Sequence, residues 1–313
     1  MAIAFLFPGQ GSQSPGMGKD LADKFSVSRQ VFEEVDDALG FSLSRLCFEG
    51  PAEELQLTEN TQPAILSVSV AAFRALEDTG FPPAAFVAGH SLGEYSALVA
   101  AGVLSLSDAA KTVRQRGRYM QEAVPVGTGA MAAVMGSELS EIEKVCKSVS
   151  GDQVCAPANI NAPNQVVIAG DASAIDRAIE GLKEVGAKRV VKLNVSAPFH
   201  CALMKPAQDR LEKDLDQLSF REAKIPVVTN VDAAVTKDPA VMRDSLIRQV
   251  SSPVRWLESM RLLIDQGVQT FVEIGPGKVL SGLMRQISRD VNYFNVEDAA
   301  SLQAAVEKAS ANS

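Results

Sequence analysis

The sequence is poor in the residues that bind metals or form disulfides, with two histidines and four cysteines among 313 residues. The cysteines share no metal-ligand spacing, and so few histidines make a zinc site hard to assemble. We therefore expect no metal centre. Free thiols are typical of a reducing compartment, so we expect a cytoplasmic protein. The four cysteines are Cys47, Cys146, Cys155 and Cys201.

Long hydrophobic runs and dense basic stretches are also absent. No apolar run reaches the length that a bilayer span requires, so we expect no membrane segment. The apolar residues 2–7 follow no basic segment, so they predict a strand rather than a signal peptide. A net charge of −8 argues against nucleic-acid binding. The best local basic patch, at Lys188, Arg189 and Lys192, fits either an acidic partner or a solvated strand end.

The chain is long for a single core, which predicts one large domain with an insert, or two domains. Apolar runs alternate with helical patterns over most of its length, and this alternation is typical of a parallel sheet covered on both faces. The expected strands are 2–7, 85–89, 225–229, 270–274 and 291–296, and the expected early helices are 17–39 and 61–78.

The middle of the chain follows a different order. Its pattern predicts strand, helix, two strands, helix and strand, at residues 130–135, 138–149, 154–160, 165–169, 173–185 and 189–195. This βαββαβ order is typical of a ferredoxin-like module. We therefore predict an α/β fold with a hydrolase-like large domain (1–124 and 198–313) and an inserted small domain (125–197).

Gly89-His90-Ser91-Leu92-Gly93 matches the G-x-S-x-G pattern and lies between a predicted strand and a predicted helix. Two glycines permit a turn that is too sharp for side chains, and such a turn exposes the serine hydroxyl above the sheet. The motif predicts that Ser91 is a nucleophile. The alternative is a structural turn flanked by glycines.

A serine hydroxyl needs a base, and the sequence offers few. His90 adjoins Ser91 in the turn, so its ring should point away and pack or hydrogen-bond beneath it. His200 precedes a predicted helix, whose N-terminus disfavours imidazolium and keeps the ring able to accept a proton. We predict that His200 is the base.

The group that orients His200 is left open by the residues themselves. Asp171 and Asp176 fit the chain order of hydrolase triads, although both resemble cap or turn residues of the predicted small domain. The other candidate is a backbone carbonyl at the end of a helix, where Gln249 lies, because the last carbonyls of a helix lack partners within it.

Two glycine-rich turns need separate interpretations. The loop at 7–13 is no nucleotide site, since Ser14 and Met17 occupy positions where the known fingerprints need Gly and Lys. It is either a plain turn or half of an oxyanion hole formed by the backbone N–H groups of Gln10 and Leu92. The turn at 273–278 (EIGPGK) fits a phosphate cradle, but a structural turn is favoured.

Arg116 falls on or beside the apolar face of a predicted helix that begins near Ser107. A buried arginine needs a carboxylate partner. An internal Asp or Glu, or a side chain that reaches the surface, would satisfy it structurally. The functional alternative is a guanidinium that waits for a substrate carboxylate.

Together these stretches resemble one family over nearly the whole chain, the malonyl-CoA:acyl carrier protein transacylases of bacterial fatty acid synthesis. The matching segments are FPGQGSQ (7–13), GHSLGEYSAL (89–98), QRGRYMQEA (115–123), NAPNQVVIAG (161–170), APFHCALMKPA (197–207) and VEIGPGKVLSGL (272–283).

The resemblance implies a ping-pong transfer of malonyl from coenzyme A to the phosphopantetheine thiol of acyl carrier protein, through an ester of Ser91. It also implies that Gln10 and Leu92 hold the oxyanion, that Arg116 binds the malonyl carboxylate and that the Gln249 carbonyl orients His200. Coenzyme A thioester is then a substrate, and no resident cofactor is expected. More weakly, it implies that Asn161 lines a cleft and that Phe199 bears on acyl selection.

Two other functions compete with this interpretation. A thioesterase or esterase would use the same serine and histidine, and a scaffold subunit would keep an inactive turn. No interface motif argues against a monomer, so a monomer is expected.

Overall fold

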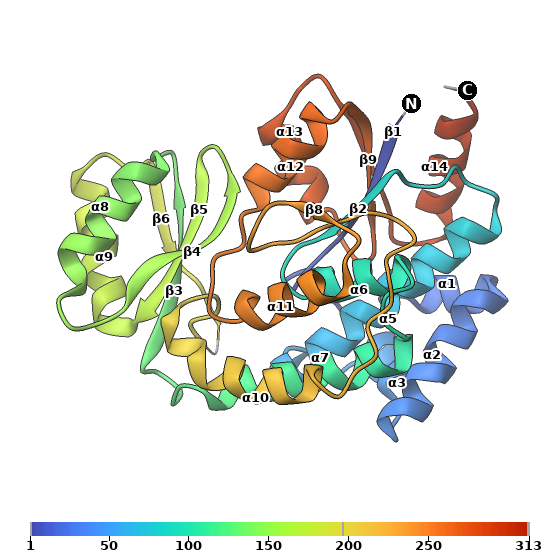
Figure 1. Cartoon of the computed structure of the whole chain (residues 1–313), viewed down its shortest axis with the longest axis horizontal. Helices are drawn as coiled ribbons and strands as arrows, with labels where there is room; N and C mark the ends of the chain where they lie inside the picture. The colour runs from blue at the N-terminus through green and yellow to red at the C-terminus, as the bar shows by residue number, and fades with distance from the viewer. Residues whose placement is uncertain (1, 196, 312–313) are drawn as a thin grey trace.

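The computed structural model describes residues 2–195 and 197–311. Residues 1, 196 and 312–313, which fall within the predicted domain ranges, lie outside this description. In these two stretches the strands form a six-stranded and a four-stranded sheet. Figure 1 shows the smaller sheet with its two helices at one side of the molecule and the larger sheet amid the remaining helices.

The larger sheet has the order β10-β9-β1-β2-β7-β8, and its neighbours are parallel except for the pair of β7 and β8. The strands are β1 (Ala2–Phe7), β2 (Phe86–Gly89), β7 (Val227–Val228), β8 (Val235–Thr236), β9 (Val268–Ile274) and β10 (Asn292–Val296). Apolar runs such as AIAFLF form central strands because both faces are buried. The parallel strands end at one common edge, where the loops that follow β1, β2 and β7 meet.

Helices pack on both faces of this sheet, around two apolar clusters. They are α1 (Lys19–Lys24), α2 (Ser26–Leu39), α3 (Leu43–Glu49), α4 (Ala52–Leu55), α5 (Thr58–Asp78), α6 (Gly93–Ala100), α7 (Leu106–Glu122), the 3-10 turn η1 (Ala202–Met204), α10 (Lys205–Leu215), α11 (Pro239–Gln249), α12 (Trp256–Asp265), α13 (Val279–Ile287) and α14 (Ala299–Ala311). The prediction of one helix over 17–39 is wrong, because extended backbone at Phe25 divides it into α1 and α2. None of the helices in the described stretches is long and apolar enough to cross a bilayer.

The smaller sheet has the antiparallel order β4-β5-β3-β6, which is the strand order of the ferredoxin-like fold. Its elements are β3 (Gly129–Met135), α8 (Leu139–Ser150), β4 (Cys155–Ala162), β5 (Gln165–Asp171), α9 (Ala172–Glu184) and β6 (Arg189–Lys192). The last strand therefore ends three residues earlier than predicted. The predicted α/β class with a βαββαβ module is confirmed, whereas 125–197 as the exact domain range stays a prediction.

Alternation along β3 shows how the small sheet joins the rest of the protein. Ala130, Ala132 and Val134 belong to the core beneath α8 and α9, whereas Met131 and Ala133 belong to the main apolar cluster of the molecule. Successive strand residues point to opposite faces. Both faces of the small sheet are therefore covered, and Met131 lies on the face that packs against the main apolar cluster.

Candidate active site

Ser91 lies on a sharp turn between β2 and α6. Its backbone φ is 52°, a left-handed value that non-glycine residues rarely adopt. The flanking glycines are required by close approach: a Cβ on Gly89 would lie 1.9 Å from the Gly93 carbonyl group, and a Cβ on Gly93 would lie 2.1 Å from the oxygen of Phe7. The turn therefore has the geometry that the G-x-S-x-G motif predicts.

His200 meets Ser91 at hydrogen-bond distance. Its Nε2 lies 2.7 Å from the Ser91 Oγ, and its Nδ1 lies 2.8 Å from the main-chain oxygen of Gln249. Because a carbonyl oxygen only accepts, the proton belongs on Nδ1, and Nε2 is left to accept from the serine hydroxyl. The backbone of His200 is also left-handed, with φ 60°. Both members of the pair are thus held in uncommon conformations, which occur mainly at functional sites.

Burial, rather than a helix N-terminus, keeps His200 neutral. Burial and then the nearby positive charge of Arg116 lower the pKa of His200 to about 3. The helix that was predicted to follow directly begins only at Lys205, after the short turn η1. The sequence predicted a neutral His200 ring because of a helix N-terminus, whereas in the structure burial is the main cause.

The other polar residues considered for the pair lie elsewhere. Asp171 accepts a hydrogen bond from the backbone of Val154, and Asp176 forms an ion pair with Lys192 on the small sheet. The ring of His90 points away from the serine hydroxyl: its Nε2 lies 2.8 Å from the Asn161 side-chain oxygen, and its ring centroid is 5.4 Å from that of Trp256. Of the candidates for orienting His200, only the Gln249 carbonyl is within reach.

Two backbone N–H groups beside Ser91 have no acceptor among the described residues. In the described part of the chain, neither Gln10 N nor Leu92 N donates a hydrogen bond, and both residues line the same small cavity as Ser91. Gln10 follows β1 and Leu92 opens α6, so adjacent parallel strands bring the two donors to one edge. Such a pair has the form of an oxyanion hole.

Arg116 on α7 is 2% exposed, yet it has no acidic partner within ion-pair distance among the described residues. It donates instead to neutral groups: Nη1 to Gln62 Oε1 at 2.7 Å, and Nη2 to Gln249 Oε1 at 2.9 Å and to Ser91 Oγ at 3.2 Å. Its buried Nε has no partner in the structure. The buried Glu94 acts on Arg116 electrostatically but forms no ion pair with it. A buried cation without a direct ionic partner is costly, which favours an anion brought by a ligand.

These groups surround a cavity of about 80 Å³. Phe199, Met120 and Met131 form its apolar wall. Asn159 lines it, whereas the predicted cleft residue, Asn161, is not among the lining residues and contacts His90 instead. A larger cavity of about 610 Å³ adjoins it and shares Gln10, Met131, Asn159 and Phe199.

Sequence reasoning missed three buried polar residues around the pair: Gln62, Glu94 and Asn230. Burial raises the pKa of the Glu94 carboxyl to about 7. Glu94 directly follows the G-x-S-x-G motif, three residues after Ser91. Asn230 follows an apolar strand at its carboxyl end, a position where polar residues gather in open α/β sheets. Gln62 carried no signal in the sequence beyond its place on a largely apolar helix.

No cluster of three or more His, Cys, Asp or Glu side chains that could hold a metal ion occurs in residues 2–195 and 197–311. The four cysteines are free and buried.

A serine on a strand–helix turn, a neutral histidine beside it and two free N–H donors, all on a hydrolase-like α/β fold, define the class of proteins that form acyl-serine esters. The sequence pattern of a family described as an acyl transferase domain matches residues 4–306. The chain is 49% identical over 306 residues to the malonyl CoA-acyl carrier protein transacylase of Bacillus subtilis. The match covers 97% of this chain and 96% of that protein. It therefore belongs to the family of malonyl CoA-acyl carrier protein transacylases, and the resemblance drawn from the six sequence segments is confirmed.

Solved structures agree with this assignment. The crystal structure of an acyl carrier protein S-malonyltransferase from Vibrio cholerae superposes with a TM-score of 0.95 at 49% identity, covering 97% of this chain and 99% of that one. A malonyl-transacylase solved in complex with its type II polyketide acyl-carrier protein gives a TM-score of 0.96 at 47% identity, covering 98% and 100% of the two chains.

Proposed function

We propose that this protein transfers a malonyl group from coenzyme A to the phosphopantetheine thiol of acyl carrier protein, through a malonyl ester of Ser91. The observation that carries the proposal is the position of the Ser91 Oγ, 2.7 Å from the His200 Nε2 and 3.2 Å from the Arg116 Nη2. One oxygen thus contacts both a proton acceptor and a buried cation. The malonyl group, coenzyme A and acyl carrier protein in this proposal are taken from the names of the relatives.

In the first half-reaction His200 takes the Ser91 proton while the serine oxygen attacks the thioester carbonyl of malonyl-CoA. The carbonyl oxygen becomes an oxyanion, which the N–H groups of Gln10 and Leu92 stabilise. When the carbon–sulfur bond breaks, the imidazolium returns the proton to the sulfur, and coenzyme A leaves as a thiol. In the second half the carrier thiol gives its proton to His200 while its sulfur attacks the ester carbonyl. When the carbon–oxygen bond to Ser91 breaks, the imidazolium returns the proton to the serine oxygen, and the malonyl group stays on the carrier sulfur.

Arg116 selects the acyl chain in this proposal. Its guanidinium meets the free malonyl carboxylate, which supplies the direct ionic partner that no described residue of the protein provides. Phe199 and the two methionines close the apolar side of the cavity, so a branched acyl chain would meet the ring of Phe199. Acyl groups without a carboxylate would leave Arg116 unpaired.

The larger adjoining cavity suits the arm that carries the thioester. Its polar lining comes from uncharged side chains, among them Gln13, Gln56, Asn159 and Asn194. Such groups can hydrogen-bond the two amides of a pantetheine chain without binding a charge. Coenzyme A is accordingly a substrate that enters and leaves, and no resident cofactor is proposed.

The same proposal covers partner and compartment. The protein acts as a monomer in the cytoplasm, and acyl carrier protein docks transiently. Lys188 and Arg189 are exposed and would suit an acidic surface of such a partner, whereas Lys192 is already paired with Asp176. Asn161 acts through His90 rather than on the acyl group.

Intact-mass spectrometry after mixing the protein with malonyl-CoA tests the proposal. We expect one malonyl adduct that maps to Ser91, persists in the absence of carrier protein and is discharged when holo acyl carrier protein is added. The Ser91→Ala variant should form no adduct. Rapid release of free malonate in the absence of carrier protein would instead make the protein a thioesterase.

A further inference from the structure

Asn230 lies directly beside the Ser91 turn, although 139 residues separate them in the chain. Strands β2 and β7 are parallel neighbours, with Val87 opposite Val227 and Ala88 opposite Val228. Their carboxyl ends therefore meet, and the loop after β7 places Asn230 against the turn after β2. Asn230 is 1% exposed.

The Asn230 side chain bonds the start of the strained turn, on either side of His90. Its Oδ1 accepts from the backbone N–H of Ser91 at 2.7 Å, and its Nδ2 donates to the carbonyl oxygen of Gly89 at 2.7 Å. A left-handed serine persists only when its surroundings hold it there. These two bonds bracket His90 and fix the peptide group that leads into Ser91, the residue whose φ is 52°.

The bond to Ser91 N also affects its neighbour. With the Ser91 N–H occupied by Asn230, the peptide group before Ser91 is fixed in orientation. The next N–H belongs to Leu92, which lines the cavity, and it has no acceptor among the described residues. The Asn230 side chain thus occupies the Ser91 N–H and leaves the neighbouring Leu92 N–H available for an oxyanion.

Glu94 holds Asn230 in place and connects it to the histidine. The Oε2 of Glu94 accepts from Asn230 N at 3.0 Å and from Gln249 Nε2 at 2.8 Å. Gln249 Nε2 also donates to the Ser91 carbonyl at 3.0 Å, while its main-chain oxygen contacts His200. The Glu94 carboxylate therefore links Asn230, which contacts Ser91, to Gln249, which contacts both Ser91 and His200.

We propose that Asn230, held by Glu94, is a positioning residue that keeps Ser91 in the backbone conformation from which it reacts. The inference rests on the proposed role of Ser91 as nucleophile. Asn230 contacts no part of the acyl cavity, so it acts on the rate of the chemical step and leaves recognition of the malonyl carboxylate to Arg116.

The test compares Asn230→Ala with Thr229→Val in single-turnover acylation by malonyl-CoA. Thr229 is the adjacent buried residue, and its hydroxyl has no partner in the structure, so its loss controls for disturbance of the same loop. We expect Asn230→Ala to lower the maximal acylation rate about 10- to 100-fold, as the loss of two buried hydrogen bonds suggests, and to change the half-saturating malonyl-CoA concentration less than about threefold. Thr229→Val should keep both values.

A second readout and a second variant protect the test from a folding defect. Phenylmethylsulfonyl fluoride labels a reactive serine without needing a carboxylate, so its rate should fall in parallel. Asn230→Asp retains the size of the side chain and the acceptor for Ser91 N but loses the donor to Gly89, and we expect an intermediate rate. Thermal melting of each variant identifies loss of fold.

The outcomes separate the inference from the proposed function. If the unmodified protein forms no malonyl ester at Ser91, the proposed function fails. If it does, and folded Asn230→Ala or Asn230→Asp acylates at the unmodified rate, or only the half-saturating concentration rises, the positioning role is overturned alone.

Discussion

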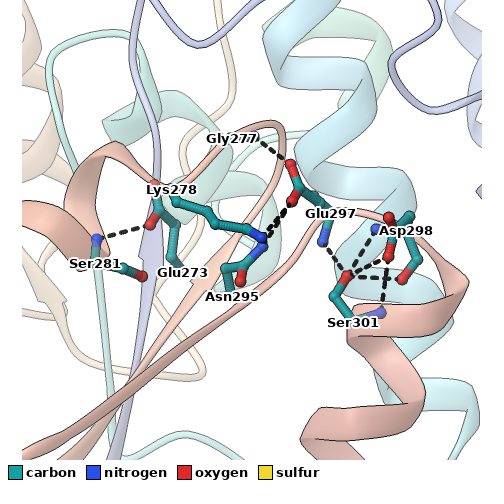
Figure 2. A network of polar contacts seen from close by, with 8 residues as sticks. All are labelled: Glu273, Gly277, Lys278, Ser281, Asn295, Glu297, Asp298 and Ser301. Carbon is teal, nitrogen blue, oxygen red and sulfur yellow. Dashed lines mark hydrogen bonds and ion pairs between the residues drawn. The ribbon is translucent and has the colours of Figure 1, made fainter.

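Two polar networks lie at the same edge of the large sheet, and they differ in how completely their members pair with one another. One follows β9, at the turn Gly275–Lys278 (Figure 2). There the Glu273 carboxylate accepts from the backbone N–H groups of Leu280 and Ser281 at 2.9 and 2.7 Å. The Gly277 N–H donates to the Glu297 carboxylate, which also meets Lys278 at 3.3 Å. The two carboxylates, Lys278 and these N–H groups thus find partners within the chain, whereas the buried Ser281 hydroxyl has none in the structure.

The network around Ser91 is left incomplete. Arg116 has no counter-charge within ion-pair reach among the described residues, and the N–H groups of Gln10 and Leu92 have no acceptor there. Buried polar groups are ordinarily paired, so such exceptions point to a missing ligand. The network at Gly277 conversely argues against a phosphate cradle, since the N–H groups of Gly277, Leu280 and Ser281 are already bound by carboxylates. Whether the polar groups are paired within the chain therefore distinguishes the structural turn after β9 from the reactive turn after β2, although both lie at the same edge of the sheet.

The largest expected difference between the networks concerns His200 and Glu273. His200→Ala should lower malonyl transfer at least about 10³-fold, because the serine loses its general base. Glu273→Gln should leave the rate within about twofold and lower the melting temperature, since only the start of α13 is affected. Steady-state transfer rates and thermal melts check both variants. A comparable loss of rate in Glu273→Gln would show that the second network also serves the reaction.

A smaller but more selective effect is expected at Arg116. Arg116→Ala should reduce malonyl transfer about ten- to a few hundred-fold, because each charged hydrogen bond contributes about 1.5–3 kcal/mol. Transfer of acetyl, which has no carboxylate, should be relatively favoured. The paired arginine Arg248, which binds Asp232 through both terminal nitrogens, provides the control. Arg248→Ala should leave the malonyl-to-acetyl ratio of rates unchanged, and an unchanged ratio in Arg116→Ala would return Arg116 to a structural role.

The dependence of the rate on pH should be smaller still. With a pKa of about 3, His200 is already neutral at every pH from 5 upward, so the rate should show no fall near pH 6.5, where an ordinary histidine protonates. Glu94, with a pKa of about 7, ionises in that range. Its ionised form accepts more strongly from Asn230 and Gln249, so we expect a rise of a few-fold as pH increases through about 7.

Single-turnover acylation between pH 5 and 8 measures this rise. The Glu94→Gln variant cannot ionise there and should give a flat profile. A rise that persists in Glu94→Gln would mean that His200 itself titrates near neutrality, and the incomplete network would then be less buried than its geometry indicates.

The parts of this site that sequence could predict are those with local patterns. Ser91 lies in a five-residue motif, and His200 stands out because only two histidines exist. Asn230 and Gln62 belong to the same site only through strand pairing and helix packing across the whole chain, which no local pattern records. The same limit applied to the fold, where periodicity predicted a helix over 17–39 but not the extended residue Phe25 that divides it.

The smallest effect is expected within the completed network, at the ion pair of Lys278 and Glu297. The Lys278 side chain is 65% exposed, so solvent and salt screen its attraction to the carboxylate, and the pair should contribute only about 0.2–1 kcal/mol to the free energy of unfolding. Lys278→Met retains much of the aliphatic stem and removes the charge. Urea unfolding at low salt should show this small loss, and at about 1 M salt the difference from the unmodified protein should largely vanish. Malonyl transfer should be unchanged, because Gly277 N still donates to Glu297 and the turn stays in place. A lower transfer rate that is specific to carrier protein, with malonyl-CoA acylation intact, would instead show that Lys278 contacts the incoming carrier, and a paired surface charge would then belong to function after all.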